Sequence, residues 1–268
     1  MSKLITVTSL RNGVGRTTIT ALTATKLANK GYKILAIDNS YKYCDLAHYL
    51  MVEPEYSIDD LKPFLGSGVL EKKSFLEMVT TAEKEIDVLA GSTLSHTDNS
   101  LKSEDIIKIR KLIEDIYDYI VIDLREGIDT EGNLELVEQA DKNIIVAQPN
   151  KHDYSHYERI LNTVEKDKKE KIEQMMGKSI IIYNKVIEEA TIDYNNGKKL
   201  VGEENIYKIH FRENILDYCN GYKCNLKDDN EKQFEKIITF ITNEKSAIKK
   251  DNSIKSKLKN LKSIFNTN

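Results

Sequence analysis

The chain has 268 residues, of which 40% are hydrophobic and 31% charged, and its formal net charge at pH 7 is −3. This composition is typical of a globular protein with a sizeable core, and it excludes a global basic field that would attract nucleic acid. Cys44, Cys219 and Cys224 are too few and too scattered for a disulfide framework, so we expect a reducing, cytoplasmic location. The sequence has no run of about 18 apolar residues that would predict a membrane-spanning helix. We also expect no signal peptide, because the first strand pattern begins at Leu4.

Short apolar runs of strand length alternate with longer helical patterns, which indicates a parallel sheet flanked by helices. In chain order we predict strand Leu4–Ser9, helix Thr17–Asn29, strand Lys33–Asp38, helix Ser57–Leu65, strand Ile86–Ala90, helix Ser103–Ile116, strand Tyr119–Asp123, helix Asn133–Gln139, strand Asn143–Ala147, helix Tyr154–Glu165, strands Ser179–Asn184 and Ile206–His210, and helix Glu231–Asn243. Several strands are apolar on both faces, as strands buried on both sides are. The sequence therefore predicts one doubly wound α/β domain over residues 1–245, with a mostly parallel sheet and helices on both faces.

A glycine-containing loop follows the first predicted strand and precedes the first predicted helix. Its sequence, SLRNGVGRTT over residues 9–18, fits the end of the phosphate-loop pattern GxxxxGK[ST], with Gly15, Arg16 and Thr17 in the last three positions. Gly13 and Gly15 permit a left-handed backbone and a close approach to phosphates, and the N-terminus of the helix attracts anions. The loop alone predicts either a nucleotide site or a tight turn between a strand and a helix.

The same loop, from Arg11 to Thr18, resembles the deviant Walker motif KGGVGKTT of the ParA/MinD family of P-loop ATPases. The resemblance extends over nearly the whole folded region, in the order and spacing of the family. The further matching runs are Ile34–Asp38 (second strand), Tyr117–Asp123 (Walker B strand), Ala140–Val146 (following strand), Ile180–Val186 (strand with an adenine-contacting asparagine) and Glu213–Leu216 (segment after the last strand). The resemblance implies a P-loop NTPase fold, ATP and Mg²⁺ as cofactors, and an ATP-dependent homodimer.

The resemblance also implies roles for individual residues. The nucleotide-binding positions would be Asn12, Gly13, Val14, Gly15, Arg16, Thr17, Thr18 and Asn184, with adenine beside Asn184. Mg²⁺ would be held by the hydroxyl of Thr17 and, through water, by Asp123. Arg11 would reach the phosphates of the partner subunit, Arg16 would contact the β and γ phosphates, and Asp38 would help place the attacking water. Arg11, Arg16 and Asp38 are therefore the implied catalytic residues.

The chain departs from the family pattern at positions that matter for hydrolysis. Arg11 and Arg16 replace the two signature lysines, and an arginine is not a conservative exchange at such a site. Leu10 replaces the first glycine of the general pattern, and Ser40 stands where hydrolysing members carry a second aspartate after Asp38. Stabilisation of transition-state charge is usually the largest catalytic contribution. We therefore expect ATP to be bound and to be hydrolysed slowly or not at all.

Residues 246–268 form a basic tether that ends in a short amphipathic helical pattern. Seven lysines follow Glu244, against only Asp251. At helical spacing the apolar side consists of Ile254, Leu258, Leu261 and Phe265. The pattern predicts a helix that lies on an anionic membrane surface. A solubilising lysine tail without fixed structure and docking onto a partner protein are the alternatives.

Two weaker patterns accompany these. His152 and His156, at positions i and i+4, could place two metal ligands on one helix face, but the sequence offers no third ligand, so an exposed helix surface is the favoured interpretation. Tyr41 and Tyr43 follow the second strand and predict either core packing or a surface for a dimer or a partner.

Three functions are compatible with these features. The leading hypothesis is a cytoplasmic ParA/MinD-like protein that dimerises around ATP and Mg²⁺, positions cellular machinery with weak ATPase activity, and attaches peripherally to the inner face of the cell membrane. The second is a non-hydrolysing localisation scaffold similar to the TadZ group of pilus-assembly proteins, which the changed loop and Ser40 favour. The third is a ParA-like DNA-partition ATPase, which the net negative charge disfavours. The protein partner is not identified by the sequence.

Overall fold

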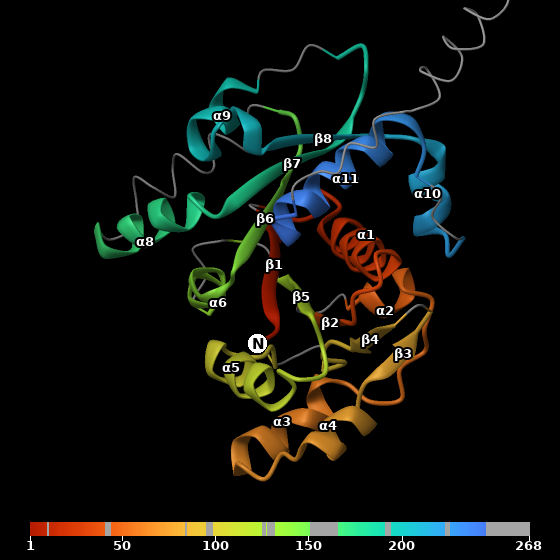
Figure 1. Cartoon of the computed structure of the whole chain (residues 1–268), viewed down its shortest axis with the longest axis vertical. Helices are drawn as coiled ribbons and strands as arrows, with labels where there is room; N and C mark the ends of the chain where they lie inside the picture. Colours follow the sequence, from red (N-terminus) through yellow and green to blue (C-terminus); the bar gives the residue numbers. More distant parts are fainter. Residues whose placement is uncertain are drawn as a thin grey trace, which may run out of the picture.

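The computed structural model describes residues 1–9, 11–40, 44–83, 85–94, 99–124, 127, 132–150, 166–190, 194–222 and 226–244. Within them, eight strands form one sheet in the order β3-β4-β2-β5-β1-β6-β7-β8 (Figure 1). Their bounds are β1 (Lys3–Ser9), β2 (Ile34–Asn39), β3 (Thr80–Ala82), β4 (Ile86–Leu89), β5 (Tyr119–Leu124), β6 (Lys142–Ala147), β7 (Ser179–Val186) and β8 (Ile206–His210). Neighbouring strands are parallel, except that β3 pairs antiparallel with β4 at one edge.

Helices cover both faces of this sheet in a single domain (Figure 1). On one face lie α1 (Arg16–Asn29), α2 (Leu46–Tyr49), α10 (Glu213–Cys219) and α11 (Asp228–Thr242). On the other lie α3 (Ile58–Ser67), α4 (Lys72–Glu77), α5 (Ser103–Leu112), α6 (Asn133–Gln139), α8 (Lys166–Met176) and α9 (Asn195–Val201), which is followed by the 3₁₀ turn η1 (Glu203–Asn205).

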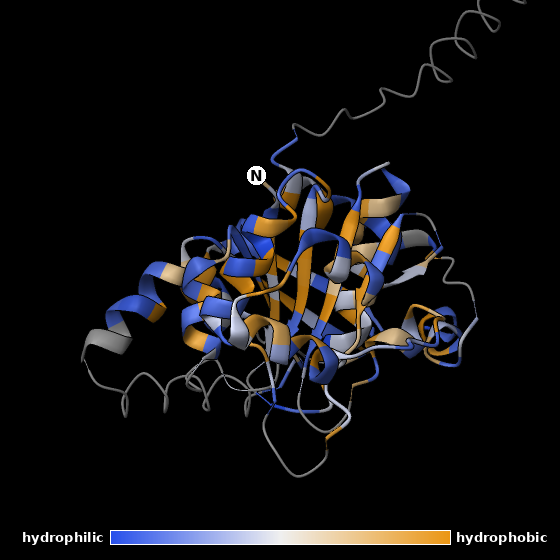
Figure 2. Cartoon of the chain, turned by 90° about the horizontal axis from the view of Figure 1, so that it is seen from below, coloured by the Kyte–Doolittle hydropathy of each residue, from blue (hydrophilic) through white to orange (hydrophobic). Residues whose placement is uncertain are grey.

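Two hydrophobic cores result, one on each face of the sheet. Alternate residues of a strand point to opposite faces, and β2 illustrates this: Leu35 and Ile37 join one core, whereas Ile34 and Ala36 join the other. Figure 2 shows the apolar strands inside and the hydrophilic sides of the helices outside. None of the helices in the described ranges is both long and apolar enough to cross a bilayer.

The seven predicted strands and the doubly wound parallel sheet are confirmed. The edge strand β3 was not predicted, because its three residues, Thr80–Ala82, carry no apolar pattern. Helix α5 ends at Leu112, four residues before the predicted Ile116, where the backbone turns and Ile116 N–H donates to Ile113 O at 2.9 Å. The predicted helix Tyr154–Glu165 lies outside the described residues.

The order of the strands places one crevice at the carboxyl edge of the sheet. Strand β1 lies between β5 and β6, so the chain leaves β1 toward β2 on one side and later crosses it to reach β6 on the other. In open α/β sheets, ligands bind outside the carboxyl ends of the strands at such a switch point. Buried polar residues gather at these strand ends: Ser9, Asp38, Asn39, Asp123 and Asn184.

Candidate functional site

The glycine loop joins the carboxyl end of β1 to α1. Gly13 and Gly15 have left-handed φ angles of 77° and 90°, which glycine adopts without strain. A Cβ atom on Gly15 would lie 2.3 Å from Nδ2 of Asn184, so no larger residue fits there. In the described residues no side chain caps α1, and its first turn contains no acidic residue. The first N–H groups and the positive end of the helix dipole are therefore available to an anion.

Strand β7 holds the loop in place from the side. The amide Nδ2 of Asn184 donates a 2.9 Å hydrogen bond to Val14 O, and Nζ of Lys185 donates one of 2.7 Å to Gly13 O. Lys185 has a left-handed φ of 58°, at the irregularity where the pairing of β7 with β8 shifts register. The hydrogen bonds of Asn184 and Lys185 to the loop therefore place the end of β7 beside the site.

A cavity of about 440 Å³ lies against the loop. This volume is typical of small-molecule sites, which span about 300–1,000 Å³. The lining contains the predicted residues Arg11, Asn12, Gly13, Val14, Gly15, Arg16, Thr17, Thr18 and Asn184. It also contains residues to which the sequence assigned no role in the site, among them Tyr49, Lys185, Phe211, Ile215, Leu216 and Cys219. In the sequence, only their place next to predicted features could have indicated a role in the site: Lys185 follows Asn184, and Phe211 follows the last predicted strand.

Asp123, at the end of β5, is fully buried and accepts hydrogen bonds from three side chains of α1. Nε of Arg16 donates to Oδ1 at 2.8 Å, Oγ1 of Thr17 donates to Oδ2 at 2.6 Å, and Oγ1 of Thr20 donates to Oδ1 at 3.2 Å. The guanidinium of Arg16 also donates from Nη1 to Oγ of Ser9 at 3.3 Å. The arginine of the loop is thus paired with the carboxylate of the neighbouring strand, an arrangement that the sequence analysis did not anticipate.

The oxygen atoms of Thr17 and Asp123 match the ligands that Mg²⁺ prefers. They also lie within hydrogen-bond distance of each other, so one ion could contact both residues. Arg16 competes for the same carboxylate, because its cationic Nε–H already occupies Oδ1. Within the part of the chain that the structure covers, no group of three His, Cys, Asp or Glu side chains could hold a metal by itself.

Asp38, at the end of β2, pairs in register with Asp123 and is also fully buried. Its Oδ1 accepts hydrogen bonds from the backbone N–H and the hydroxyl of Ser40, and its Oδ2 accepts one of 3.0 Å from Leu46 N–H. Burial and the charge of Asp123 raise the pKa of Asp38 to about 7, and the donated hydrogen bonds oppose this rise. The carboxylate holds the start of α2 and does not line the loop cavity.

Arg11 lies at the rim of the loop cavity, near the end of β6. Its Nη2 donates to Oε1 of Gln148 at 2.9 Å, and its carbonyl accepts a 2.9 Å hydrogen bond from Oγ of Ser9. The guanidinium is therefore anchored within its own subunit in this structure.

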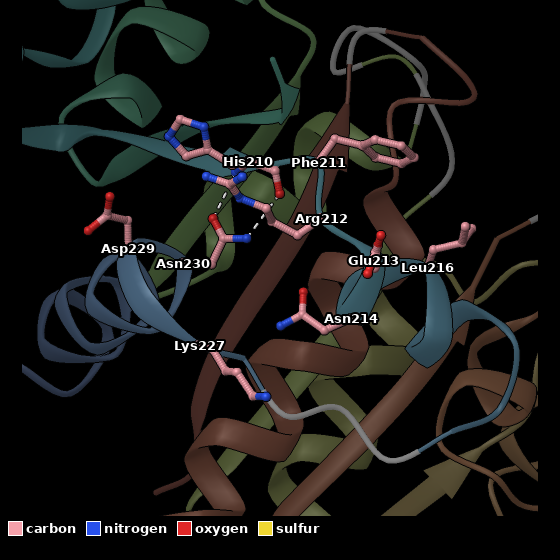
Figure 3. A pocket seen from close by; sticks show the side chains of 9 residues that line it. All are labelled: His210, Phe211, Arg212, Glu213, Asn214, Leu216, Lys227, Asp229 and Asn230. Carbon is pink, nitrogen blue, oxygen red and sulfur yellow. Dashed lines mark hydrogen bonds between the residues drawn. The ribbon is translucent and has the colours of Figure 1, made fainter. Parts of the chain in front are cut away.

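A second cavity of about 560 Å³ adjoins the first and shares Phe211 and Leu216 with it (Figure 3). Its lining is His210, Phe211, Arg212, Glu213, Asn214, Leu216, Lys227, Asp229 and Asn230. The amide of Asn230 pairs with the backbone of His210, accepting from its N–H at 2.8 Å and donating to its O at 2.9 Å, and so ties α11 to β8. Because they share Phe211 and Leu216, the two cavities form one crevice, and the exposed Phe211 lies where they meet.

Several predicted residues lie outside the described ranges. They are the tail residues Ile254, Leu258, Leu261 and Phe265, the pair His152 and His156, and Tyr41, Tyr43 and Cys224.

The sequence and the fold both have clear relatives. A sequence model of the family described as an AAA domain matches residues 2–177, which is well over half of the chain. The septum site-determining protein MinD of Synechocystis sp. is 26% identical over 167 residues, which cover 62% of this chain and 60% of that protein. The chain thus spans about three fifths of the length of such curated relatives.

Two solved structures illustrate the shared fold. The ParA family ATPase from Chlorobium tepidum TLS superposes with a TM-score of 0.69 at 20% identity, over 87% of this chain and 97% of that one. The MinD protein complexed with Mg-ADP from Pyrococcus horikoshii OT3 gives a TM-score of 0.68 at 18% identity, over 90% of this chain and 96% of that one.

Proposed function

This chain belongs to the ParA/MinD family of P-loop ATPases, and we propose that it binds ATP at the glycine loop, hydrolyses it slowly and positions other cellular machinery. The observation that carries the proposal is the loop between β1 and α1, where two left-handed glycines and an uncapped helix N-terminus border a cavity of nucleotide size. The MinD relative from P. horikoshii, solved with Mg-ADP, supports the same ligand class.

In this proposal the phosphates, the metal ion and the base of the nucleotide each contact a different set of residues in the crevice. The N–H groups of the loop and the guanidinium of Arg16 bind the phosphates. Thr17 and Asp123 are the residues that would hold Mg²⁺, which supplies charge neutralisation at the phosphates when it is bound. The base lies beside Asn184 and Phe211, where the two cavities meet.

Hydrolysis is slow in this proposal because the groups that would assist it are engaged elsewhere. Both oxygens of Asp38 accept hydrogen bonds inside the fold, and Ser40 donates to Asp38 where family members that hydrolyse ATP carry a second carboxylate. Arg16 is directed at Asp123. We expect turnover on the order of 10⁻⁴–10⁻³ per second, as for a P-loop enzyme without its stimulating partner.

One purified sample tests binding and hydrolysis together. Calorimetry with ATP should show saturable binding, and a phosphate-release assay should show slow turnover that Asp123→Asn abolishes. Absence of ATP binding would contradict the proposal. Tight binding with no turnover at all would favour the second candidate, a nucleotide-bound localisation scaffold, for which the engaged Asp38 and Ser40 are the supporting contacts.

We propose in addition that ATP brings two subunits together and that Arg11 then contacts the phosphates of the partner subunit. Arg11 lies at the cavity rim, where its bond to Gln148 must be exchanged for that contact. Light scattering with and without ATP should show a dimer only with ATP, and Arg11→Ala should remain monomeric. A dimer of unchanged stability in Arg11→Ala would contradict this role.

We propose that residues 246–268 attach the protein to an anionic membrane surface. The basic amphipathic pattern supports this, and dimerisation would double a weak anchor. Liposomes that contain anionic lipid should pellet the full chain with ATP, whereas both residues 1–245 alone and Leu258→Glu in the full chain should stay in solution. Equal pelleting of the full chain and residues 1–245 would contradict the proposal, and binding to DNA instead of liposomes would support the partition function.

A further inference from the structure

The negative charge of Asp123 is already balanced within the chain. The carboxylate is fully buried, and it forms an ion pair with the guanidinium of Arg16, whose side chain is 11% exposed. A buried carboxylate without a partner is costly, and here the loop arginine meets that requirement. Thr17 and Thr20 complete the hydrogen bonds to the same two oxygens. In a metal-dependent phosphate site, the bound ion would contribute this balancing charge.

The guanidinium is suited to contact Asp123 and a phosphate at the same time. It carries five N–H donors in one plane, of which Nε is directed to Asp123 and Nη1 to Ser9. Arg16 also lines the loop cavity, the space where we place the phosphates. Arginine binds carboxylate and phosphate groups strongly through such paired donors.

We propose that Arg16 is a built-in cation that bridges Asp123 and the bound phosphates, so that this site binds nucleotide without needing a divalent metal. The inference rests on the proposed binding of ATP and concerns what balances its charge. A divalent ion that coordinates the hydroxyl oxygen of Thr17 could leave the hydrogen bond from Thr17 to Asp123 in place, but it would lie beside the guanidinium of Arg16, which carries a like charge.

Lysine, the usual residue of the motif, cannot make the same bridge. In an extended side chain, lysine has the apolar Cε atom where arginine has Nε, so the 2.8 Å bond from Arg16 to Asp123 has no equivalent. Arg16→Lys keeps the positive charge and removes the bridge. It is therefore the matched variant for this proposal.

Calorimetry on the full chain tests the proposal with two probes, ATP and inorganic tripolyphosphate, each in excess MgCl₂ and in excess EDTA. We expect the Kd of the wild-type chain to differ by less than about threefold between the two media, and that of Arg16→Lys to weaken by about tenfold or more in EDTA. A wild-type chain that binds well only with Mg²⁺ overturns this inference and leaves ATP binding intact. A wild-type chain that binds ATP in neither medium overturns the proposed function and this inference with it.

A second variant keeps the test decisive if Arg16→Lys does not fold. Thr17→Ala removes the hydroxyl that a metal would use and leaves the pair of Arg16 and Asp123 in place. Whatever affinity the missing hydroxyl costs in both media, we expect the Kd of Thr17→Ala for ATP to differ by less than about threefold between MgCl₂ and EDTA, as in the wild-type chain. A tenfold loss confined to the MgCl₂ medium would show that the metal carries the affinity and would overturn the proposal. Thermal melting of each variant checks that it is folded.

Discussion

Phe211 stands where the two cavities of the crevice meet, directly after β8. The residue is 54% exposed, next to the exposed Arg212 and Glu213, and it lines both cavities. Exposed aromatic rings beside phosphate sites are platforms on which bases stack, because every base has an apolar face. A substitution of Phe211 should therefore affect the binding of the base of the proposed nucleotide and not the binding of its phosphates.

Phe211→Ala should weaken ATP binding about tenfold, since base–aromatic stacking is worth roughly 1–3 kcal/mol. Binding of tripolyphosphate, which has no base, should stay unchanged, and calorimetry measures both. Tyr222→Ala is the matched control, because Tyr222 is 66% exposed and lines neither cavity. An equal loss for ATP and tripolyphosphate would place Phe211 at the phosphates or in the fold and not at the base.

The same scale shows what the sequence could and could not predict about the site. The loop residues and Asn184 were predicted to lie together, because their types and order in the chain match a known motif, and all of them line one cavity. The pairing of Arg16 with Asp123 was not predicted, since a motif specifies which residues are present and not which partner a long side chain selects. Nor could a motif reveal that Asp38 is engaged by Ser40 and Leu46, because those bonds depend on the path of the chain after β2.

At the scale of elements, β7 packs so closely against the glycine loop that no side-chain atom can be added at Gly15. A Cβ on Gly15 would clash with Asn184 and would also need a left-handed backbone, whereas Gly13 requires only the backbone conformation. Gly15→Ala should therefore lower the free energy of unfolding by about 3 kcal/mol and Gly13→Ala by about 1 kcal/mol. Urea denaturation measures both.

The double variant Gly15→Ala, Asn184→Ala provides the internal control for this clash. Removing the amide of Asn184 frees the space, so the combined loss should be smaller than the sum of the two single losses. Strict additivity would mean that Gly15 is required for its backbone conformation alone.

The carboxylate of Asp59, in helix α3, links this helix to the loop before α5 through hydrogen bonds. Asp59 accepts hydrogen bonds from Ser92, Thr93 and Asn99. Burial alone would raise the pKa of Asp59, but these hydrogen bonds outweigh it and lower the pKa below its usual value. A lowered pKa means that the contact stabilises the fold above the unfolded-state pKa of about 4, and that this contribution is lost as the pH falls through the folded-state pKa.

Asp59→Asn should therefore be less stable than the wild type by about 1 kcal/mol near pH 7, since the charged hydrogen bonds are replaced by weaker ones. The difference should shrink toward zero as the pH falls below the folded-state pKa of Asp59, where the carboxyl is protonated in both states. Chemical denaturation across the pH range measures it. A difference that persists unchanged at low pH would assign the effect to the shape of the side chain and not to its charge.

Some helices and strands could be predicted from the sequence and others could not, and the difference has physical reasons. Long apolar strands such as β5 and β7 are buried on both faces, so their sequences identify them directly. Helix α8 was missed because its sequence, KDKKEKIEQMM, is mostly charged and buries only a few residues, among them Ile172 and Met175. Helices as short as α2 and the edge strand β3 depend on tertiary contacts and not on a periodic pattern.

For the whole molecule, one continuous sheet connects the two halves of the site. The loop follows β1 at the centre, Asp45 and Tyr49 follow β2 on one side, and Asn184 lies on β7 on the other, and all of them line the loop cavity. A ligand in the crevice thus contacts both halves, and its binding energy should stabilise the entire fold. We therefore expect unfolding in a single transition that ATP shifts as a whole.

At a free ATP concentration of about 100 times Kd, binding to the folded state raises the free energy of unfolding by about 2.7 kcal/mol. This corresponds to an increase in Tm of roughly 5–10 °C for a domain of this size. Scanning calorimetry and circular dichroism should give the same midpoint with and without ATP. Gly15→Ala, which distorts the loop, should show little or no increase. Two separate transitions, of which ATP shifts only one, would mean that the halves unfold independently.

The hydrogen bond between Asn184 and Val14 has a consequence for folding during synthesis on the ribosome. The two residues are 170 positions apart in the chain, and at about 5–20 residues per second the ribosome needs roughly 10–30 s to add the intervening segment. Throughout that interval the glycine loop exists without the strand that fixes its shape. If the chain binds nucleotide as proposed, a nascent chain would bind it only after β7 has been synthesised and has paired with the rest of the sheet.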